Sequence, residues 1–407
     1  MTDRRLPRWS SLRPLLRIKP IELDRTAGRL ARACTIGDLR SIARRRTPRA
    51  VFDYVDGAAE EELNLHRARA AFERVEFQPR VLRDVSAVDT ATTILGRPAA
   101  LPLVFAPTGF TRMMHHEGEP ACARAAARAG IPYALSTMGT TSIEDLARAA
   151  PGTEKWFQLY VWRDRGRSND LMERALASGY QALVLTVDVP VAGARLRDAR
   201  NGLTIPPTLT ARTLLDGARH PSWWFNLLTT EPLSFASMSR SPSSLQDLID
   251  SMFDPAVTLD DVRWLRDAWP RALVVKGVQG VADAKELAEL GVDAIVVSNH
   301  GGRQLDRAPV PLELLPEVVD AVGDRLEILL DTGIRSGADV VAAVALGARA
   351  CMVGRAYLYG LMAGGQRGVE RAADILGGEL VRTMRLLGVA AVKELDRSCV
   401  SLRGMTA

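Results

Sequence analysis

Eight short apolar runs, each ending in polar or glycine residues, recur along this chain. They are LPLVFAPTG (101–109), IPYALST (131–137), WFQLY (156–160), ALVLTVD (182–188), ALVVKG (272–277), AIVVSNHGG (294–302), EILLDTG (327–333) and ACMVGR (350–355). Runs of this length and composition predict buried strands. Alanine-rich amphipathic stretches such as 118–130 and 281–291 lie between most of them and predict helices. This alternation requires a parallel sheet, because parallel strands need a crossover connection.

Eight such units predict an α/β fold, a closed (β/α)8 barrel of the TIM type. An open doubly wound sheet is the alternative, but the G-x-G-x-x-G fingerprint is missing after the first strand. The fourth and fifth runs start 90 residues apart, which predicts a long insertion after the fourth strand. We predict one domain over 1–407. Its parts are a basic arm and helices (1–98, with helices near 35–47 and 58–72), a barrel (99–375, with an insertion at about 196–257) and a C-terminal helical segment (376–407).

Charge is concentrated at the N-terminus. Residues 1–50 hold 14 Lys/Arg and 4 Asp/Glu, although the whole chain carries only +5. A basic arm of this kind fits an anionic membrane surface or an acidic partner, or it is simply solvated. Lysine and arginine residues are not interleaved with aromatic residues as they are in nucleic-acid-binding motifs, so no nucleic-acid partner is expected.

The sequence also bears on compartment and metal content. It has no run of eighteen uncharged apolar residues, and its first twenty residues lack the apolar core of a secretory signal. The four cysteines are scattered without metal-type spacing. We therefore expect a cytoplasmic protein with reduced thiols and without a bound metal.

Active sites of such barrels lie at the C-terminal ends of the strands. His300 is the only one of five histidines at such an end, and Asp188 ends another strand. A carboxylate that orients an imidazole favours a general base; a capped or surface histidine is the structural alternative. Gly301 and Gly302 would let a ligand approach the backbone beside the imidazole.

Cationic residues near the strand ends favour anionic ligands. Arg303, close to His300, and Arg195, beyond Asp188, could hold a carboxylate substrate, although a surface salt bridge is an alternative for Arg195. Lys276 ends the fifth strand and could form a Schiff base or face an anionic cofactor. The seventh and eighth strand ends predict a phosphate site that contains Gly333, Arg335, Gly354 and Arg355.

The motif SNHGGRQLD (298–306) within this eight-strand pattern resembles the signature of the FMN-dependent L-2-hydroxy acid dehydrogenase/oxidase family. The resemblance covers about 33–400 and is greatest to actinobacterial respiratory L-lactate dehydrogenases. Further motifs that carry it are FDYVDGAAEEE, APTGFTRMMHHEGE, KWFQLYVWRDR, LTVDVPVAGARLRD, LDTGIRSGADV and GRAYLYGL.

The resemblance implies FMN as the cofactor and a role for each matching residue. His300 would take a proton from the substrate, with Asp188 stabilising the imidazolium and Tyr160 bonding the substrate hydroxyl. Tyr54, Arg195 and Arg303 would bind the carboxylate. Lys276 would lie by the flavin ring, which decides against a Schiff-base lyase. The remaining FMN contacts would come from Thr108, Ser136, Gln158, Thr186, Ser298, Asp331, Gly333, Arg335, Gly354 and Arg355.

The sequence constrains the identity of the substrate and of the electron acceptor less than it constrains the cofactor. Gly109 and Met138 leave room for a small alkyl group, which favours L-lactate and its product pyruvate. Electrons would pass to a quinone or a cytochrome of the respiratory chain. The alternatives are an oxidase or monooxygenase that uses O2, a 2-hydroxy acid other than lactate, and an FMN-binding relative without activity.

Two further expectations concern assembly. Members of the family are usually homotetramers. An apolar cluster in the insertion fits a peripheral contact with the inner face of the plasma membrane, or packing over the barrel. This cluster consists of Trp223, Trp224, Phe225, Leu227 and Leu228.

Overall fold

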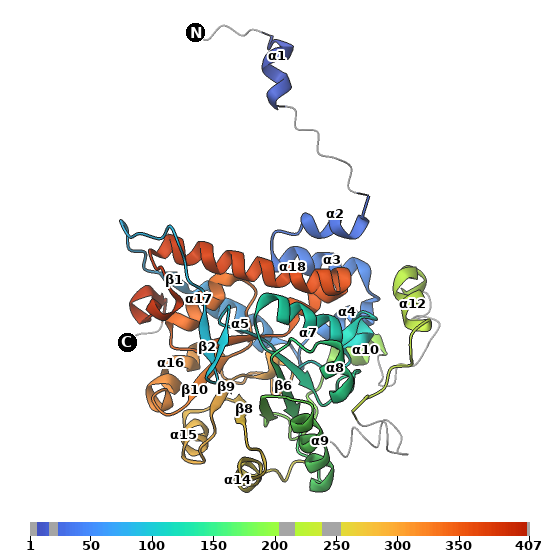
Figure 1. Cartoon of the computed structure of the whole chain (residues 1–407), viewed down its shortest axis with the longest axis vertical. Coiled ribbons are helices and arrows are strands. Elements are labelled where there is room, and N and C mark those ends of the chain that lie inside the picture. The colour runs from blue at the N-terminus through green and yellow to red at the C-terminus, as the bar shows by residue number, and fades with distance from the viewer. Residues whose placement is uncertain (1–5, 16–22, 203–215, 238–253, 405–407) are drawn as a thin grey trace.

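The computed structural model describes residues 6–15, 23–202, 216–237 and 254–404. Its centre is a closed barrel of eight parallel strands in chain order (Figure 1), as the sequence predicts. The strands are β4 (Leu103–Phe105), β5 (Tyr133–Ser136), β6 (Lys155–Leu159), β7 (Ala182–Thr186), β8 (Ala272–Val278), β9 (Ala294–Val297), β10 (Glu327–Leu330) and β11 (Ala350–Val353). Most of these strands end a few residues before the end of the corresponding predicted run. The polar residues at the end of each run therefore lie in the loop that follows the strand.

A helix follows each strand and packs on the outside of the barrel. These helices are α7 (Gly118–Ala129), α8 (Ile143–Ala149), α9 (Arg165–Ala177), α14 (Leu259–Ala268), α15 (Val281–Glu289), α16 (Pro311–Val322), α17 (Gly337–Ala345) and α18 (Arg355–Leu387). Side-chain caps fix several starts: Thr258 and Asp261 form a capping box on α14, and Ser336 and Asp339 form one on α17.

Side chains fill the inside of the barrel, so it is a core and not a pore. Trp156, Val184, Val274 and Leu329 are fully buried there. A hairpin of β2 (Thr92–Ile94) and β3 (Arg97–Ala99) adds Ile94 to the same cluster. The chemistry is thereby left to the loops at the C-terminal ends of the strands.

The N-terminal part of the chain is helical. It contains α1 (Trp9–Leu12), a 3-10 turn (Arg13–Leu15), α2 (Arg25–Ala31), α3 (Ile36–Arg46), α4 (Arg49–Asp56) and α5 (Leu63–Glu73). In Figure 1, α1 lies outside the body, and α2 and α3 lie beside α18. The helix predicted over 58–72 begins only at Leu63, because Glu60 and Glu62 adopt positive φ angles.

The C-terminal segment is helical only in part. α18 runs through the predicted boundary at 375/376 and ends at Leu387, where Gly388 has a φ of 74°. Two 3-10 turns follow (Val392–Glu394 and Arg397–Cys399), and then β12 (Val400–Leu402), which pairs with β1 (Val75–Phe77). The difference from the predicted helical segment arises because this end of the chain completes a small sheet with residues far away in the sequence.

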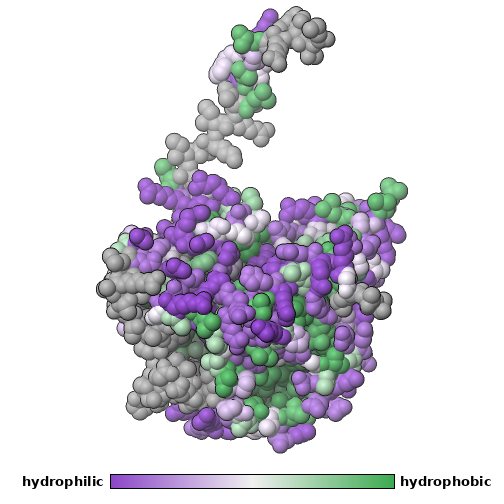
Figure 2. Space-filling model, turned by 180° about the vertical axis from the view of Figure 1, so that it is seen from behind, coloured by the Kyte–Doolittle hydropathy of each residue, from purple (hydrophilic) through white to green (hydrophobic). Residues whose placement is uncertain are grey.

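The insertion after β7 contributes α10 (Leu196–Asn201) and α12 (Pro221–Leu228). Residues 203–215 and 238–253 of the predicted insertion lie outside the described residues. Within the described chain, no helix combines the length and the hydropathy needed to cross a bilayer. The face of the molecule in Figure 2 is largely hydrophilic around the N-terminal helices and has hydrophobic residues gathered in its lower part.

Candidate active site

A cavity of about 400 Å³ opens at the C-terminal ends of the barrel strands. Its walls bring together residues from the barrel loops and from α4. Most of the residues predicted from the sequence line it: Tyr54, Thr108, Ser136, Tyr160, Arg195, Lys276, His300, Arg303, Asp331, Gly333, Arg335, Gly354 and Arg355. Gln158, Thr186 and Ser298 are buried and do not belong to this lining, and the carboxylate of Asp188 contacts the imidazole of His300.

His300 and Asp188 form a directly bonded pair. The Nδ1 atom of His300 lies 2.9 Å from Oδ1 of Asp188, and the Asp188 side chain is only 1 % exposed. Burial raises the pKa of Asp188, but the charge and hydrogen bond of His300, with Lys276, outweigh it and leave this pKa below its usual value. An ionised carboxylate only accepts hydrogen bonds, so Nδ1 carries a proton, and Nε2 is the ring nitrogen that this contact leaves free for a ligand.

Two guanidinium groups flank this pair. Arg303 donates hydrogen bonds to the carbonyl oxygens of Tyr54 (2.6 Å) and Gly57 (3.1 Å), and its guanidinium lies 5.0 Å from the Tyr54 ring centroid. Burial and the charge of Arg195 lower the pKa of Arg303 to about 10. Nε of Arg195 is buried and has no hydrogen-bond partner among the described residues. A small carboxylate bound between Arg195 and Arg303 would raise the pKa of Arg303 again and would accept a hydrogen bond from Nε of Arg195.

Lys276 projects from β8 into the cavity with its charge compensated. Its Nζ lies 3.0 Å from Oδ2 of Asp331 and donates to Oγ of Ser298 at 3.0 Å. Burial lowers the pKa of Lys276, but the carboxylates of Asp331 and Asp188 outweigh it, so the pKa is raised overall. The lysine is therefore held as a buried cation.

Two polar side chains near the C-terminal ends of β6 and β7 have atoms without hydrogen-bond partners among the described residues. Ser136 donates to Oε1 of Gln158 at 3.0 Å. Nε2 of Gln158 and Oγ1 of Thr186 are buried and have no hydrogen-bond partner in the described structure. Native proteins rarely leave such groups unsatisfied. These two groups could therefore bond to the polar edge of a bound ligand.

The predicted phosphate corner holds two further guanidinium groups. Arg355 donates to the carbonyl oxygens of Val55, Gly57 and Gly301. Burial, with the charges of Arg335 and Arg303, lowers the pKa of Arg355 to about 9. This corner is therefore built for an anion.

Gly301 and Gly302, which the sequence analysis expected to let a ligand approach the backbone, also have a role within the protein, and Gly301 lines the cavity. Both have positive φ angles, and a Cβ on Gly301 would lie 2.6 Å from Nη1 of Arg355. A Cβ on Gly302 would lie 3.1 Å from the backbone nitrogen of Leu65. The glycines make room for a guanidinium and for α5, and so they fix the loop that carries His300.

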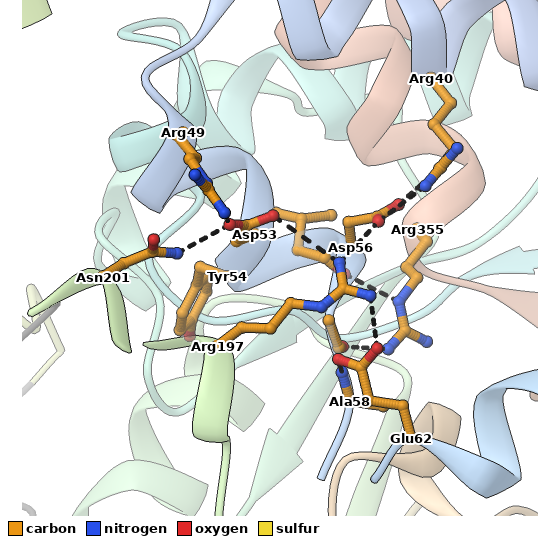
Figure 3. Close-up of polar contacts among 12 residues, drawn as sticks. Arg40, Arg49, Asp53, Tyr54, Asp56, Ala58, Glu62, Arg197, Asn201 and Arg355 are labelled. Carbon is orange, nitrogen blue, oxygen red and sulfur yellow. Dashed lines mark hydrogen bonds and ion pairs between the residues drawn. The ribbon is translucent and has the colours of Figure 1, made fainter. Parts of the chain in front are cut away.

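A network of ion pairs that the sequence analysis missed holds the walls of the cavity together (Figure 3). Arg197 of α10 contacts Asp53, Asp56 and Glu62, and Arg40 of α3 donates to Asp56. The network joins α10, which follows Arg195, to α4, which carries Tyr54. The charged segments ARLRD and FDYVDG contained this signal, but their pairing depends on the tertiary fold.

Comparison with known proteins assigns the family. Residues 43–402 match the family described as FMN-dependent dehydrogenase. The chain belongs to this family. Its cofactor is therefore FMN, and the residues present fit that group: the unpartnered donors of Gln158 and Thr186 match a polar ring edge, and Arg335 and Arg355 match a phosphate.

Individual relatives of the family are similar over nearly the whole chain. A protein of Mycobacterium tuberculosis named "Putative L-lactate dehydrogenase" is 58 % identical over 394 residues, which cover 97 % of this chain and 95 % of the relative. An L-lactate dehydrogenase of Caulobacter vibrioides is 44 % identical and covers 90 % and 97 %. The crystal structure of the monotopic membrane protein (S)-mandelate dehydrogenase matches with a TM-score of 0.88 at 38 % identity, over 91 % of this chain and all of that chain.

Proposed function

We propose that this protein oxidises L-lactate to pyruvate with FMN and passes the electrons to a quinone or a cytochrome of the respiratory chain. The observation that carries the proposal is the imidazole–carboxylate pair of His300 and Asp188 beside the guanidinium groups of Arg195 and Arg303. A base next to two cations suits a substrate that loses a proton close to a carboxylate. The L-lactate dehydrogenases among the relatives support lactate as that substrate.

In this proposal each polar group has one task. Arg195, Arg303 and Tyr54 bind the substrate carboxylate, and Tyr160 donates a hydrogen bond to the substrate hydroxyl. Nε2 of His300 takes the proton that the substrate gives up, and Asp188 stabilises the imidazolium that results.

The FMN contacts follow from the same cavity. When bound there, FMN would supply the acceptor for the two electrons that leave the substrate. Lys276 contributes a positive charge near the flavin ring, and Asp331, its ion-pair partner, holds the ribityl chain. Thr108, Ser136, Gln158, Thr186 and Ser298 hold the ring, and Gly333, Arg335, Gly354 and Arg355 hold the phosphate.

The proposed preference for lactate rests on the size of one wall. Gly109 and Met138 both line the cavity, and a Cβ on Gly109 would lie 2.9 Å from Cβ of Met138. Met138 therefore packs directly on Gly109, and its flexible side chain sets the size of this wall. The experiment is to compare kcat/KM for L-lactate, glycolate and L-mandelate; a higher value for either of the last two would contradict the assignment.

We also propose that α12 contacts the membrane that contains the acceptor. Of the five apolar residues predicted to do so, Phe225 and Leu228 are 67 % and 72 % exposed. Trp223 instead packs inward, and its Nε1 donates to the carbonyl oxygen of Met113 at 2.9 Å. Replacing Phe225 and Leu228 with serine should weaken liposome binding, whereas replacing Leu386, 74 % exposed on α18, should not.

One experiment separates the acceptor classes. The protein is mixed with L-lactate without oxygen, the flavin absorbance is followed, and air is then admitted. Absorbance that bleaches and recovers only slowly in air supports a dehydrogenase, and rapid recovery supports an oxidase or a monooxygenase instead. An FMN-loaded protein that does not bleach would contradict the proposal.

A homotetramer is proposed as the assembly, and light scattering tests it.

A further inference from the structure

A second cavity, of about 230 Å³, lies next to the active-site cavity. It is bounded by α2, α3, α12, the middle of α18 and α6 (Thr111–Met114). Met114 lines both cavities, so the two are neighbours. The function proposed above makes no use of the second cavity.

The lining of this cavity is strongly cationic. Its charged residues are Arg29, Arg46, Arg112, Arg367 and Glu117, together with the imidazoles of His115 and His116. Arg367 is paired with Asp24, which leaves the guanidinium groups of Arg29, Arg46 and Arg112 against a single carboxylate among the lining residues. A cavity of this charge attracts an anion.

The carboxylate is already engaged within the protein. Gly364 and Gly365 interrupt α18 with φ angles of −174° and 63°, so a second helical segment begins there. The backbone nitrogen of Gln366 donates to Oε2 of Glu117 at 2.6 Å. Glu117 therefore stabilises a helix start and is less able to neutralise the arginines around it.

Two nitrogen atoms in the lining have no acceptor. Nε of Arg29 and Nδ1 of His116 are buried and lack a hydrogen-bond partner among the described residues. Arg29 is held in place through Nη2, which donates to the carbonyl oxygen of Ala363 at 3.0 Å. A buried donor without an acceptor is costly, and Nδ1 of His116 is a donor in one of its two tautomers. Nε of Arg29, and Nδ1 of His116 in that tautomer, would be satisfied by a ligand with acceptor oxygens.

The electrostatics agree with this geometry. Burial lowers the pKa of His115 to about 4; Glu117 opposes the shift, and His116 and Arg46 add to it. Burial and the charge of Arg46 also lower the pKa of Arg29. Arg46 thus adds to the effect of burial at both positions, although Asp24 partly offsets it at Arg29.

We propose that this cavity binds a phosphoryl group. Such a group has two terminal acceptor oxygens and about one negative charge in a diester, or three and nearly two in a monoester, which match the guanidinium groups and the unpartnered donors. Its source is either the headgroup of an anionic phospholipid or a soluble phosphorylated compound. Ser222 and Trp223 of α12 line the cavity, so the lipid source rests on the membrane contact proposed above, whereas phosphoryl binding itself does not.

A metal ion is the competing ligand. His115, His116 and Glu117 offer ligand atoms that all lie within 4.8 Å of one another. The surrounding arginines disfavour a cation, since Arg46 already acts against positive charge on His115. Titration with zinc chloride therefore belongs in the same experiment.

The experiment titrates inorganic phosphate and glycerol 1-phosphate into the FMN-loaded protein by calorimetry. We expect both ligands to bind the unchanged protein and to bind at least tenfold more weakly to Arg46→Gln and to His116→Gln. The matched control is Arg45→Gln, an exposed arginine one residue before Arg46 on the same helix, and should bind as the unchanged protein does. Flavin content and anaerobic bleaching by L-lactate should stay unchanged in all three variants, which separates this proposal from the proposed function.

Vesicle sedimentation then identifies the source. Loss of binding to phosphatidylglycerol vesicles in the two cavity variants, but not in Arg45→Gln, supports a lipid headgroup. Unchanged vesicle binding with lost phosphate binding supports a soluble compound. The proposal is overturned if phosphate does not bind, if the cavity variants bind it as well as the control, or if His116→Gln weakens the binding of zinc but not of phosphate.

Discussion

Oδ1 of Asp188 lies 2.9 Å from Nδ1 of His300, and the carboxylate is buried while the imidazole remains 25 % exposed toward the cavity. The carboxylate thus approaches the ring from behind, where solvent does not reach it. Its hydrogen bond fixes both the ring orientation and the position of the ring proton. Every proposed task of His300 depends on this contact.

Asp188→Asn should therefore lower the rate of anaerobic flavin bleaching by about 10³–10⁴-fold, because the amide no longer selects the tautomer with a free Nε2. Flavin content should stay the same. The rate is measured by stopped-flow absorbance, with the exposed Asp283→Asn as the control. A bleaching rate within threefold of the unchanged protein would mean that the pair has only a structural role.

The barrel and the members of the site could largely be predicted, because both depend on local patterns. Each apolar run predicts a strand by itself, and a barrel then places every strand end on one face. The Arg197–Asp56 ion pair could not be predicted, since its partners are 141 residues apart and meet only through the fold. The same holds for the close approach of Arg355 to Gly301, which are 54 residues apart.

Gly193 is a second residue whose role appears only in the structure. A Cβ there would lie 2.3 Å from the carbonyl oxygen of Arg303, and the Gly193 backbone nitrogen donates to Oε1 of Gln304 at 3.1 Å. Gly193→Ala should displace the loop that carries Arg195 and lower kcat/KM about 10- to 100-fold, mainly through KM. Steady-state kinetics tests this, with Gly152→Ala, which meets no atom within 4 Å, as the control. Equal KM values in the two variants would contradict it.

Replacing Lys276 alone should cost more stability than replacing both members of its buried ion pair with Asp331. Lys276→Met leaves the Asp331 carboxylate buried without its cation, and we expect a loss of about 3–5 kcal/mol in the free energy of unfolding. The double variant Lys276→Met/Asp331→Asn should recover much of that loss. Urea unfolding at several FMN concentrations measures both and separates loss of stability from loss of FMN binding. Equal stabilities of the single and double variants would show that the ion pair is not the cause.

Asp56 makes the stability of the cavity wall depend on pH. Burial raises the pKa of Asp56, but hydrogen bonds from Arg40 and Tyr359 outweigh it and lower this pKa to about 2. A pKa below the unfolded value of 3.8 stabilises the fold above pH 4 and loses that contribution as the pH falls toward 2. Asp56→Asn should therefore be about 2 kcal/mol less stable than the unchanged protein at pH 7, with a difference that shrinks between pH 4 and pH 2. Urea unfolding across this range checks the trend against Glu61→Gln, whose 72 % exposed carboxylate lies 3.7 Å from Arg307. A difference that is constant with pH would show that Asp56 acts through packing and not through its charge.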